Sequence, residues 1–200
     1  MNDNGITISG KIIKVFNKNF SEERLVSNAT LVHERKTKDV IVKEYYSIET
    51  WNNDMEKYLQ KEVVIEGYLN QYKYEKDNTT HYNIKILANN IKENINNENI
   101  NIVKMRGYVN NLENDENKTK FIIKYGYYKQ NKDNKDIKEK VYNKFFITDW
   151  NKNNIKNDDY IYLEGKITQT NNNNKVYYDI NAKKIEILEN KKNKDIDISF

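Results

Sequence analysis

The sequence contains no cysteine and no proline among its 200 residues, and it has only two histidines, His33 and His81. Without cysteine the chain can form no disulfide, offers no thiol nucleophile and cannot build a cysteine-based zinc site. Two histidines cannot supply an HExxH pair or a histidine-rich catalytic metal site. No apolar run approaches the ~20 residues of a membrane-spanning helix, and residues 1–3 do not begin a signal peptide. We therefore expect a soluble, intracellular protein with no cofactor, no bound metal, no membrane partner and no catalytic residues.

Hydrophobic residues are also scarce, at 37% of the chain, while charged residues make up 32%. Disordered chains share this balance but lack aromatic residues, whereas here aromatics make up 12% of the chain and include 16 tyrosines. The core must therefore be built from Ile, Val, Tyr and Phe, which favour β-strands. A/T-rich codons explain the abundance of Asn, Lys and Ile, so asparagine runs are interpreted as loop residues.

One pattern of rare residues occurs twice in the chain. Its two copies contain, in order, Gly10, Trp51 and Gly67, and Gly107, Trp150 and Gly165. The first spacing is 41 residues in one copy and 43 in the other, and the second is 16 and 15. Agreement between the rarest residue types indicates a tandem duplication.

Each copy predicts five β-strands, over residues 6–16, 28–33, 40–51, 63–74 and 82–87, and over 102–109, 120–128, 141–150, 160–168 and 176–180. Between the third and fourth strands of the first copy, Asp54 is a plausible N-cap, and Met55, Tyr58 and Leu59 share one face of a short helix. The corresponding residues 152–159 predict only a turn. Glycines inside strands mark bulges or sharp bends that let strands curl into a barrel.

Five strands with a helical connector after the third are typical of an OB-fold. The sequence therefore predicts an all-β protein with two tandem OB-fold five-stranded barrels, a short helix in the first, and an acidic C-terminal tip. The expected domains are residues 1–93 and 101–188, with a linker at 94–100 and a short tail at 189–200.

The stretch from Trp51 to Gly67, WNNDMEKYLQKEVVIEG, resembles the signature of bacterial single-stranded DNA-binding proteins, the SSB family. Residues 28–31, Asn-Ala-Thr-Leu, resemble the second strand of that family. The resemblance covers nearly all of residues 5–92 and, more weakly, 101–188. It implies single-stranded DNA as the partner and, since the family usually presents four OB-folds per particle, a homodimer.

The last six residues, Asp-Ile-Asp-Ile-Ser-Phe, resemble the acidic tip that ends bacterial SSB proteins. In that comparison Ile198 and Phe200 fill an apolar pocket of a replication or repair protein, and Asp195 and Asp197 are attracted to its basic rim. Two features depart from the family. Ser199 stands where the family has proline, and the preceding linker is far shorter.

The resemblance also implies which aromatic side chains stack on bases. Trp51 and Trp150 match one stacking position, Tyr45 matches another, and Tyr74, with Tyr72 on the same face, matches a third. In the second copy Lys144 and Asn172 stand at two of these positions, and Phe146 or Tyr127 is expected to substitute. The alternative is that these aromatic side chains pack inside the barrels.

Lysines supply the expected phosphate contacts. Residues 1–99 carry a net charge of −1 and residues 100–200 a net charge of +5. The long loop between the second and third strands of the second copy contains Lys129, Lys132, Lys135, Lys138 and Lys140, and Lys144 follows. These lysines either hold DNA phosphates or line an ordinary solvated loop. As a hypothesis, stacking dominates in the first barrel and electrostatics in the second.

The sequence therefore predicts a non-enzymatic protein that coats and protects single-stranded DNA without sequence preference. It would recruit DNA replication, repair and recombination proteins through its tip, in the cytoplasm and on the nucleoid if the source is bacterial. Two alternatives stay open, an RNA- or tRNA-binding OB-fold protein and a protein-only adaptor, because stacking does not distinguish ribose from deoxyribose.

Overall fold

The structure is a computed structural model, and it describes residues 4–21, 24–51, 54–76, 79–130, 138–172 and 175–188. Its ten strands are β1 (Asn4–Ser21), β2 (Arg24–Lys36), β3 (Ile41–Trp51), β4 (Glu62–Lys76), β5 (Thr79–Glu93), β6 (Asn101–Asn114), β7 (Thr119–Gln130), β8 (Lys138–Asp149), β9 (Tyr160–Asn172) and β10 (Lys175–Leu188). All ten predicted strands are present, and the prediction of an all-β protein is confirmed.

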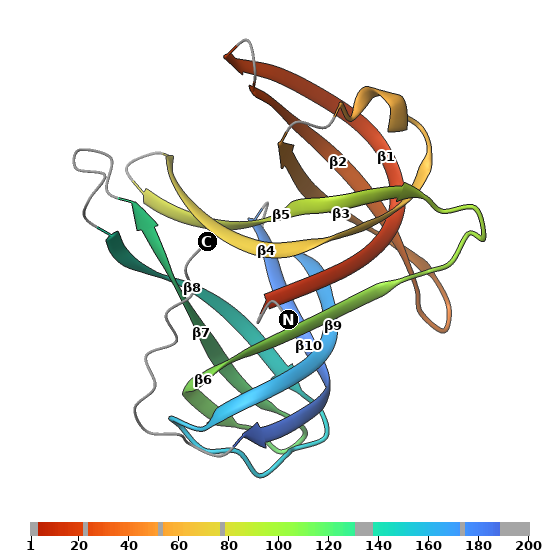
Figure 1. The fold of residues 1–200 in the computed structure, drawn as a ribbon. Helices are drawn as coiled ribbons and strands as arrows, with labels where there is room; N and C mark the ends of the chain where they lie inside the picture. The colour runs from red at the N-terminus through yellow and green to blue at the C-terminus, as the bar shows by residue number, and fades with distance from the viewer. Residues whose placement is uncertain are drawn as a thin grey trace.

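The strands close into two barrels of the same topology. In the first barrel the hydrogen-bonded order is β1, β2, β3, β5, β4 and back to β1, and in the second it is β6, β7, β8, β10, β9 and back to β6. Among the described strands, only the β3–β5 and β8–β10 pairings are parallel, over three residue pairs each. Figure 1 shows the first barrel at the top and the second at the bottom. This strand order is that of the OB-fold.

Alternation along the strands explains the two cores. From Asn101 to Val109 in β6, every second side chain is buried and the residues between them are exposed or partly exposed. The inward positions hold mostly aliphatic residues, such as Ile8, Ile65 and Leu163, all fully buried. Successive side chains of a strand point to opposite faces, so this pattern directs one apolar set inward and leaves a polar set outside.

Glycines allow two strands to approach closely at the predicted bends. A Cβ atom on Gly10 would lie 2.3 Å from the carbonyl oxygen of Val32, and one on Gly67 would lie 2.1 Å from that of Leu87. The β4–β5 register also shifts between Glu66 and Gly67, which marks a β-bulge. The equivalent glycines of the second barrel are also crowded, Gly165 by the carbonyl oxygen of Asn181 at 2.5 Å and Gly107 by a methyl group of Ile123 at 2.5 Å.

The predicted helix of the first barrel is wrong in type and extent. The structure has a single 3-10 turn, η1 (Glu56–Tyr58), between β3 and β4. Asp54 does accept a hydrogen bond from the backbone N–H of Glu56, at 2.9 Å, and Met55 is fully buried, but Leu59 is exposed. The chain turns back at Gln60, which has a positive φ of 65° and donates its backbone N–H to the carbonyl of Ile12. This reversal ends the helical segment after a single turn. In the described part of the chain no helix is long and apolar enough to cross a membrane.

The two barrels are joined edge to edge by β1 and β6. These strands pair antiparallel from Asn4↔Met105 to Ile8↔Asn101, so that all ten strands form one sheet. The central pair, Ile6 and Val103, are equivalent residues of the two copies. An antiparallel pairing centred on equivalent residues is the self-complementary contact of a two-fold symmetric dimer, here within one chain.

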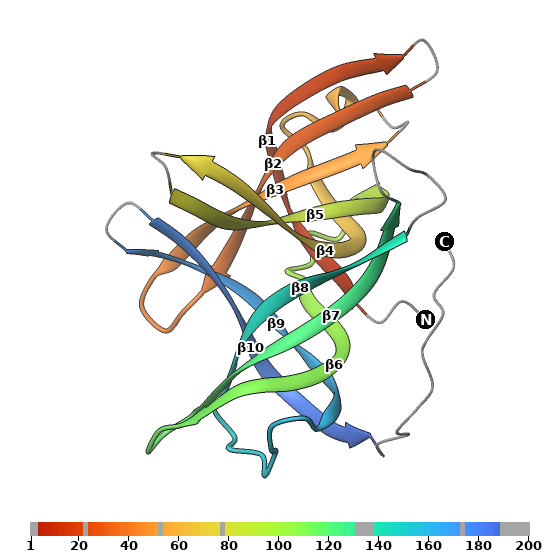
Figure 2. The same ribbon diagram turned by 90° about the vertical axis from the view of Figure 1, so that its left-hand side faces the viewer.

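Two glutamines make a second, equally symmetric connection. Gln169 Oε1 accepts from the backbone N–H of Tyr45 at 2.9 Å, and its Nε2 donates to the carbonyl of Tyr45 at 2.9 Å. Gln71 does the same to Lys144, accepting at 3.2 Å and donating at 3.0 Å. The hairpins that carry them, β4–β5 and β9–β10, project to the same side in Figure 2. Each barrel therefore forms side-chain hydrogen bonds to the backbone of one strand in the other barrel.

A buried polar cluster lies beneath one of these connections. The carboxylate of Glu44 is almost fully buried, pairs with Arg35 at 2.8 Å, and accepts from the hydroxyl of Tyr46 at 2.9 Å. The same hydroxyl lies 3.1 Å from the carbonyl oxygen of Ile167 in the second barrel. Burial and the neighbouring Glu44 carboxylate raise the pKa of Tyr46, so its hydroxyl stays protonated and bridges the barrels.

Candidate nucleic-acid interface

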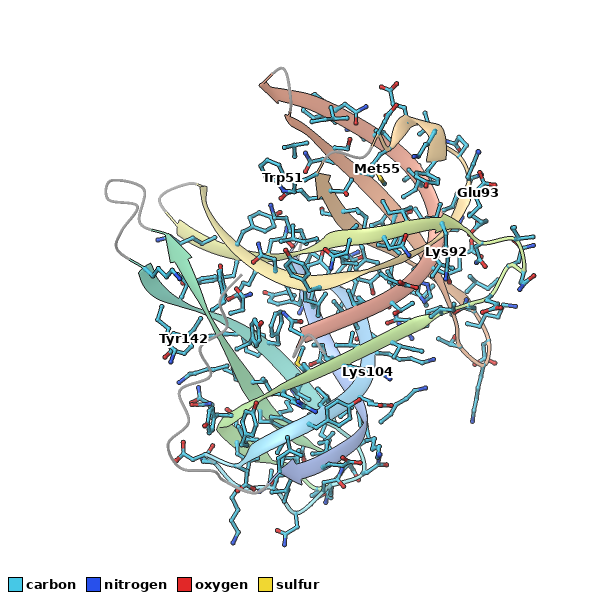
Figure 3. All side chains as sticks on the ribbon, viewed as in Figure 1. Trp51, Met55, Lys92, Glu93, Lys104 and Tyr142 are labelled. Carbon is cyan, nitrogen blue, oxygen red and sulfur yellow. The ribbon has the colours of Figure 1, made fainter. Side chains whose placement is uncertain are left out.

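The outward face of β3 carries two of the predicted stacking residues. Tyr45 and Trp51 are exposed, Trp51 by 50%, while Glu44, Tyr46 and the other even-numbered residues up to Thr50 are buried. Six residues separate the two rings, so they lie on the same side of the strand. Both are therefore outside the core, contrary to the alternative that they pack inside the barrel. Figure 3 labels Trp51 on the first barrel.

Neighbouring strands add aromatic and cationic groups to this face. Tyr72 on β4 is partly buried, and Lys85 on β5 holds its ammonium group 5.5 Å from the centre of the Tyr72 ring. Lys85 also pairs with Glu49 at 2.5 Å, which fixes its position. Phe16 on β1 is 62% exposed and lies opposite Asn28 of β2. Sequence reasoning missed Phe16 and Lys85, because only the register of β1 and β5 shows which way they point.

Several predicted residues lie outside what the structure describes. For Tyr74 and Lys129 only the backbone is described, and Lys132, Lys135, Asp195, Asp197, Ile198 and Phe200 are not described at all. Their roles stay predictions.

The second barrel presents an equivalent face. Phe146 on β8 and Trp150 just beyond it are exposed, Trp150 by 55%, and Tyr142 lies on the same side of β8. The indole N–H of Trp150 donates to Oδ1 of Asn181 at 3.0 Å, and the ammonium group of Lys118 lies 5.0 Å from the ring centre. The ring is therefore held in a fixed orientation beside a cation. The even spacing of Tyr142, Phe146 and Trp150 could have identified Tyr142 from the sequence.

Tyr127 does not belong to this face. It lies at an odd-numbered position of β7, on the same side as the buried Phe121 and Ile123, and is itself partly buried. Burial and, to a smaller extent, the nearby Tyr68 of the first barrel raise the pKa of Tyr127. Of the two substitutes expected from the sequence, only Phe146 lies on the same face as Trp150.

Lysines gather on the outward side of β7 and β8. The prediction that Lys138 and Lys140 lie in a loop is wrong, because both belong to β8, where they are exposed together with Lys144. Lys124, which the sequence analysis did not single out, lies directly opposite Lys144. Like charges directly opposite each other destabilise a sheet, and among the described residues neither lysine forms an ion pair with a carboxylate. An anionic ligand would relieve this repulsion.

One carboxylate lies within the second face. Asp179 on β10 accepts a hydrogen bond from the hydroxyl of Thr148 at 2.7 Å. Burial raises the pKa of Asp179, while the hydrogen bond from Thr148 and the charge of Lys120 act in the opposite direction.

Each barrel therefore offers exposed aromatic rings and ammonium groups on the equivalent outward face. Rings can stack on bases and ammonium groups can neutralise phosphates. In the described residues no cluster of three or more His, Cys, Asp or Glu side chains is placed to hold a metal ion.

Comparison with protein-family models and with curated protein sequences gives no match. Among solved structures, the chain is similar to the wild-type single-stranded DNA-binding protein from Thermus aquaticus, with a TM-score of 0.67 and 12% identity over 92% of each chain. A deletion mutant of that protein matches with the same TM-score and identity, over 92% of this chain and 94% of the other. The resemblance expected from the sequence is therefore confirmed for the fold, which both barrels share with the Thermus aquaticus protein.

Proposed function

We propose that this protein binds single-stranded DNA without sequence preference, through the outward faces of its two barrels, residues 1–93 and 101–188. The observation that carries the proposal is the placement of Trp51 and Trp150. They occupy equivalent positions, at the end of β3 and just beyond β8, are about half exposed, and share their faces with further aromatic and cationic side chains. The fold shared with the Thermus aquaticus single-stranded DNA-binding protein supports it.

The chemistry of the two faces favours a single strand over a duplex. Stacking on an aromatic ring contributes ~1–3 kcal/mol per base, tolerates every base, and requires bases that are not already stacked in a helix. The lysines of β7 and β8 add affinity that does not depend on sequence. Both contributions are binding interactions, so the proposed activity makes or breaks no bond.

A titration with oligo(dT) tests the proposal. Bases stacked on Trp51 and Trp150 should quench tryptophan fluorescence, and the binding should weaken with salt. Competition between poly(dT) and poly(U) then separates DNA from RNA binding. An unchanged fluorescence together with no retention on a single-stranded DNA column would exclude the proposal and favour a protein-only adaptor.

We further propose that Asp195–Phe200 recruits replication, repair or recombination proteins. The support is the resemblance of these residues to the family's acidic tip. Removing Ile198, Ser199 and Phe200 should leave DNA binding intact or slightly stronger and abolish capture of a tip-binding enzyme in a pull-down. Phe200→Ala keeps chain length and charge and isolates the apolar anchor. Equal capture by the intact, truncated and substituted chains would exclude this role.

A homodimer with four OB-folds is likewise proposed from the family resemblance. The mass of the purified chain, measured with and without oligo(dT), tests it directly. A mass of 24.0 kDa at all concentrations would show that one chain, with its internal two-fold arrangement, acts alone.

A further inference from the structure

The outward face of the first barrel contains a hollow of about 360 Å³ to which five strands contribute side chains. Its size lies near the lower end of the ~300–1,000 Å³ typical of small-molecule sites. Its floor is made by short polar side chains of β2 and β3. Thr30 lies directly opposite Ser47, and Asn28 lies one outward position along β2. These small residues leave the space that a larger pair would fill.

Aromatic rings border the hollow on two sides. Phe16 of β1 lies opposite Asn28, and Tyr72 comes from β4, so the rings approach the floor from different strands of the barrel. Two rings flanking a polar floor can enclose a flat, apolar-faced group whose edge carries hydrogen-bonding atoms. A nucleobase is such a group.

Cations lie at both ends of the same row of residues. Lys14 is opposite Thr30 in the β1–β2 register, and Lys85 is opposite Ser47 in the β3–β5 register. Strand spacings of about 4.8 Å put roughly 14 Å, measured along the sheet, between the Cα atoms of Lys14 and Lys85. Lysine side chains can reach inward from both ends, and an ammonium group has three donors, so Lys85 can bind a phosphate while it contacts Glu49.

The second barrel has a different surface at these positions. Phe146 stands where the first barrel has Ser47, and Ile122 lies opposite it in place of Thr30. The β8–β10 register places Asp179 where the first barrel has Lys85. There the floor is large and apolar, and one of the cations is replaced by a carboxylate.

We propose that the hollow is a nucleotide slot, in which one base of the bound strand inserts between Phe16 and Tyr72 and its flanking phosphates meet Lys14 and Lys85. The slot rests on the proposed single-stranded DNA binding and extends it. The two barrels hold the strand differently, the first by inserting a base and the second by stacking bases on an exposed surface.

Substituting Ser47→Phe gives the first barrel the residue that the second barrel has at this position. If the slot holds a base, the new ring fills it, and Kd for oligo(dT) should rise by about 5- to 150-fold, the loss of one base stack. If the first barrel binds bases only on its surface, an added exposed ring leaves Kd unchanged or lowers it. The slot and surface-only binding therefore predict different changes in the Kd of Ser47→Phe.

Phe16→Ala provides a second test that adds no bulk. It should weaken binding by a similar factor, and Phe16→Tyr should restore it. The control is Tyr82→Ala, because Tyr82 has a similar exposure of 65% but does not line the hollow. Thermal unfolding of each variant confirms that it is folded.

The outcomes separate the slot from the function on which it rests. If the wild-type chain fails to bind oligo(dT), the proposed function is excluded and the slot with it. If the wild type binds and either Ser47→Phe binds equally well or Phe16→Ala matches Tyr82→Ala, the slot alone is excluded.

Discussion

Trp51 and Trp150 occupy equivalent positions but have different surroundings. The indole N–H of Trp150 is hydrogen-bonded to Asn181, and Lys118 lies beside its ring. Trp51 lies opposite Val26 of β2, whose small apolar side chain is buried beside it. A base that stacks on Trp150 therefore meets a cation at the ring.

Trp51→Ala should weaken oligo(dT) binding by ~1–3 kcal/mol, the contribution of one stacked base. Because half of the ring is already exposed, the thermal unfolding midpoint should change little. Fluorescence anisotropy of a labelled oligonucleotide measures the affinity, and far-UV circular dichroism follows the sheet. A cooperative loss of β-sheet signal would mean that the ring stabilises the barrel instead.

Asp179→Asn should stabilise the protein at neutral pH and tighten DNA binding. The pKa of Asp179 is raised by burial, so the folded state holds its proton more tightly than the unfolded state, whose pKa is near 3.8. The contribution of Asp179 to the free energy of unfolding is therefore greatest below pH 3.8. It is lost as the pH rises through the pKa that Asp179 has in the folded state. The asparagine still accepts from Thr148 without carrying a charge.

The melting temperatures of the two proteins should therefore differ at pH 7 and converge in acid. Thermal unfolding between pH 3 and pH 7 measures this. A less stable variant at pH 7 would show that hydrogen bonds to the ionised carboxylate outweigh its burial.

Side-chain direction along one strand could be predicted from the sequence, but neighbours across strands could not. The even spacing of Tyr45 and Trp51 is enough to put them on one face, because side chains alternate. The registers of β1 and β5 place Phe16 and Lys85 on the first face, and the turn before β7 places Lys118 beside Trp150 on the second. Register depends on tertiary packing, which short-range patterns do not contain.

At the level of elements, every strand exists where it was predicted, but most are longer. β2 was predicted over residues 28–33 and extends over Arg24–Lys36, and β10 was predicted over 176–180 and extends to Leu188. At the β4–β5 and β7–β8 hairpins, the added residues 75–76, 79–81, 129–130 and 138–140 form the outer ends and are all polar or charged. Such ends are held by backbone hydrogen bonds to a partner strand, so apolar alternation gives no signal for them.

Gly67→Ala should destabilise the first barrel by about 1–3 kcal/mol, the usual cost of overpacking. Its Cβ would lie 2.1 Å from the carbonyl oxygen of Leu87, which is backbone and cannot rotate away. Gly5→Ala is the matched control, because the nearest atom to its Cβ would be 3.9 Å away. Urea unfolding compares the two variants. Equal stability would show that the β4–β5 bulge adjusts at no cost.

The facing lysines of β7 and β8 should contribute measurably to the salt dependence of binding. Lys124→Gln with Lys144→Gln should reduce the slope of log K against log[salt] by about 1.4, if each neutralises one phosphate. The same double variant should be slightly more stable without DNA, because it relieves a like-charge pair.

Lys92 and Lys104 provide a control with the same loss of charge. Each is paired with a glutamate, and both lie to the right of Trp51 and Tyr142 in Figure 3. Replacing both with Gln should leave the slope nearly unchanged. Equal slopes for the two double variants would mean that overall charge, rather than the β7–β8 face, attracts the strand.

For the whole molecule, the duplication is visible in the sequence but the two-fold arrangement is not. Equal spacing of glycines and tryptophans predicts two similar barrels and says nothing of how they meet. The β1–β6 pairing uses backbone groups, which every sequence has. In the sequence Gln71 and Gln169 look like ordinary polar residues of a hairpin, because the backbone groups that they bind lie in the other barrel.

Gln169→Ala should selectively expose the backbone of Tyr45. β3 pairs with β5 from Ser47 to Glu49, so Tyr45 lies beyond that pairing. Its backbone N–H and carbonyl group are both hydrogen-bonded to the Gln169 amide. Amide hydrogen exchange should therefore accelerate at Tyr45 and stay slow at Lys144, and Gln71→Ala should give the reverse. Each variant is the control for the other. Global stability should fall by only about 1–3 kcal/mol, since two hydrogen bonds are lost and β1–β6 still joins the barrels.

The same variants test whether the two faces act as one platform. A strand that contacts both barrels gains affinity from the fixed distance between them, and a looser connection lowers the effective concentration of the second face. Combining Gln71→Ala with Gln169→Ala should leave affinity for a short oligo(dT) unchanged and weaken binding of one long enough to span both faces. Titrations against oligonucleotides of increasing length measure this. A length dependence identical to that of the wild type would show that β1 and β6 alone hold the barrels in register.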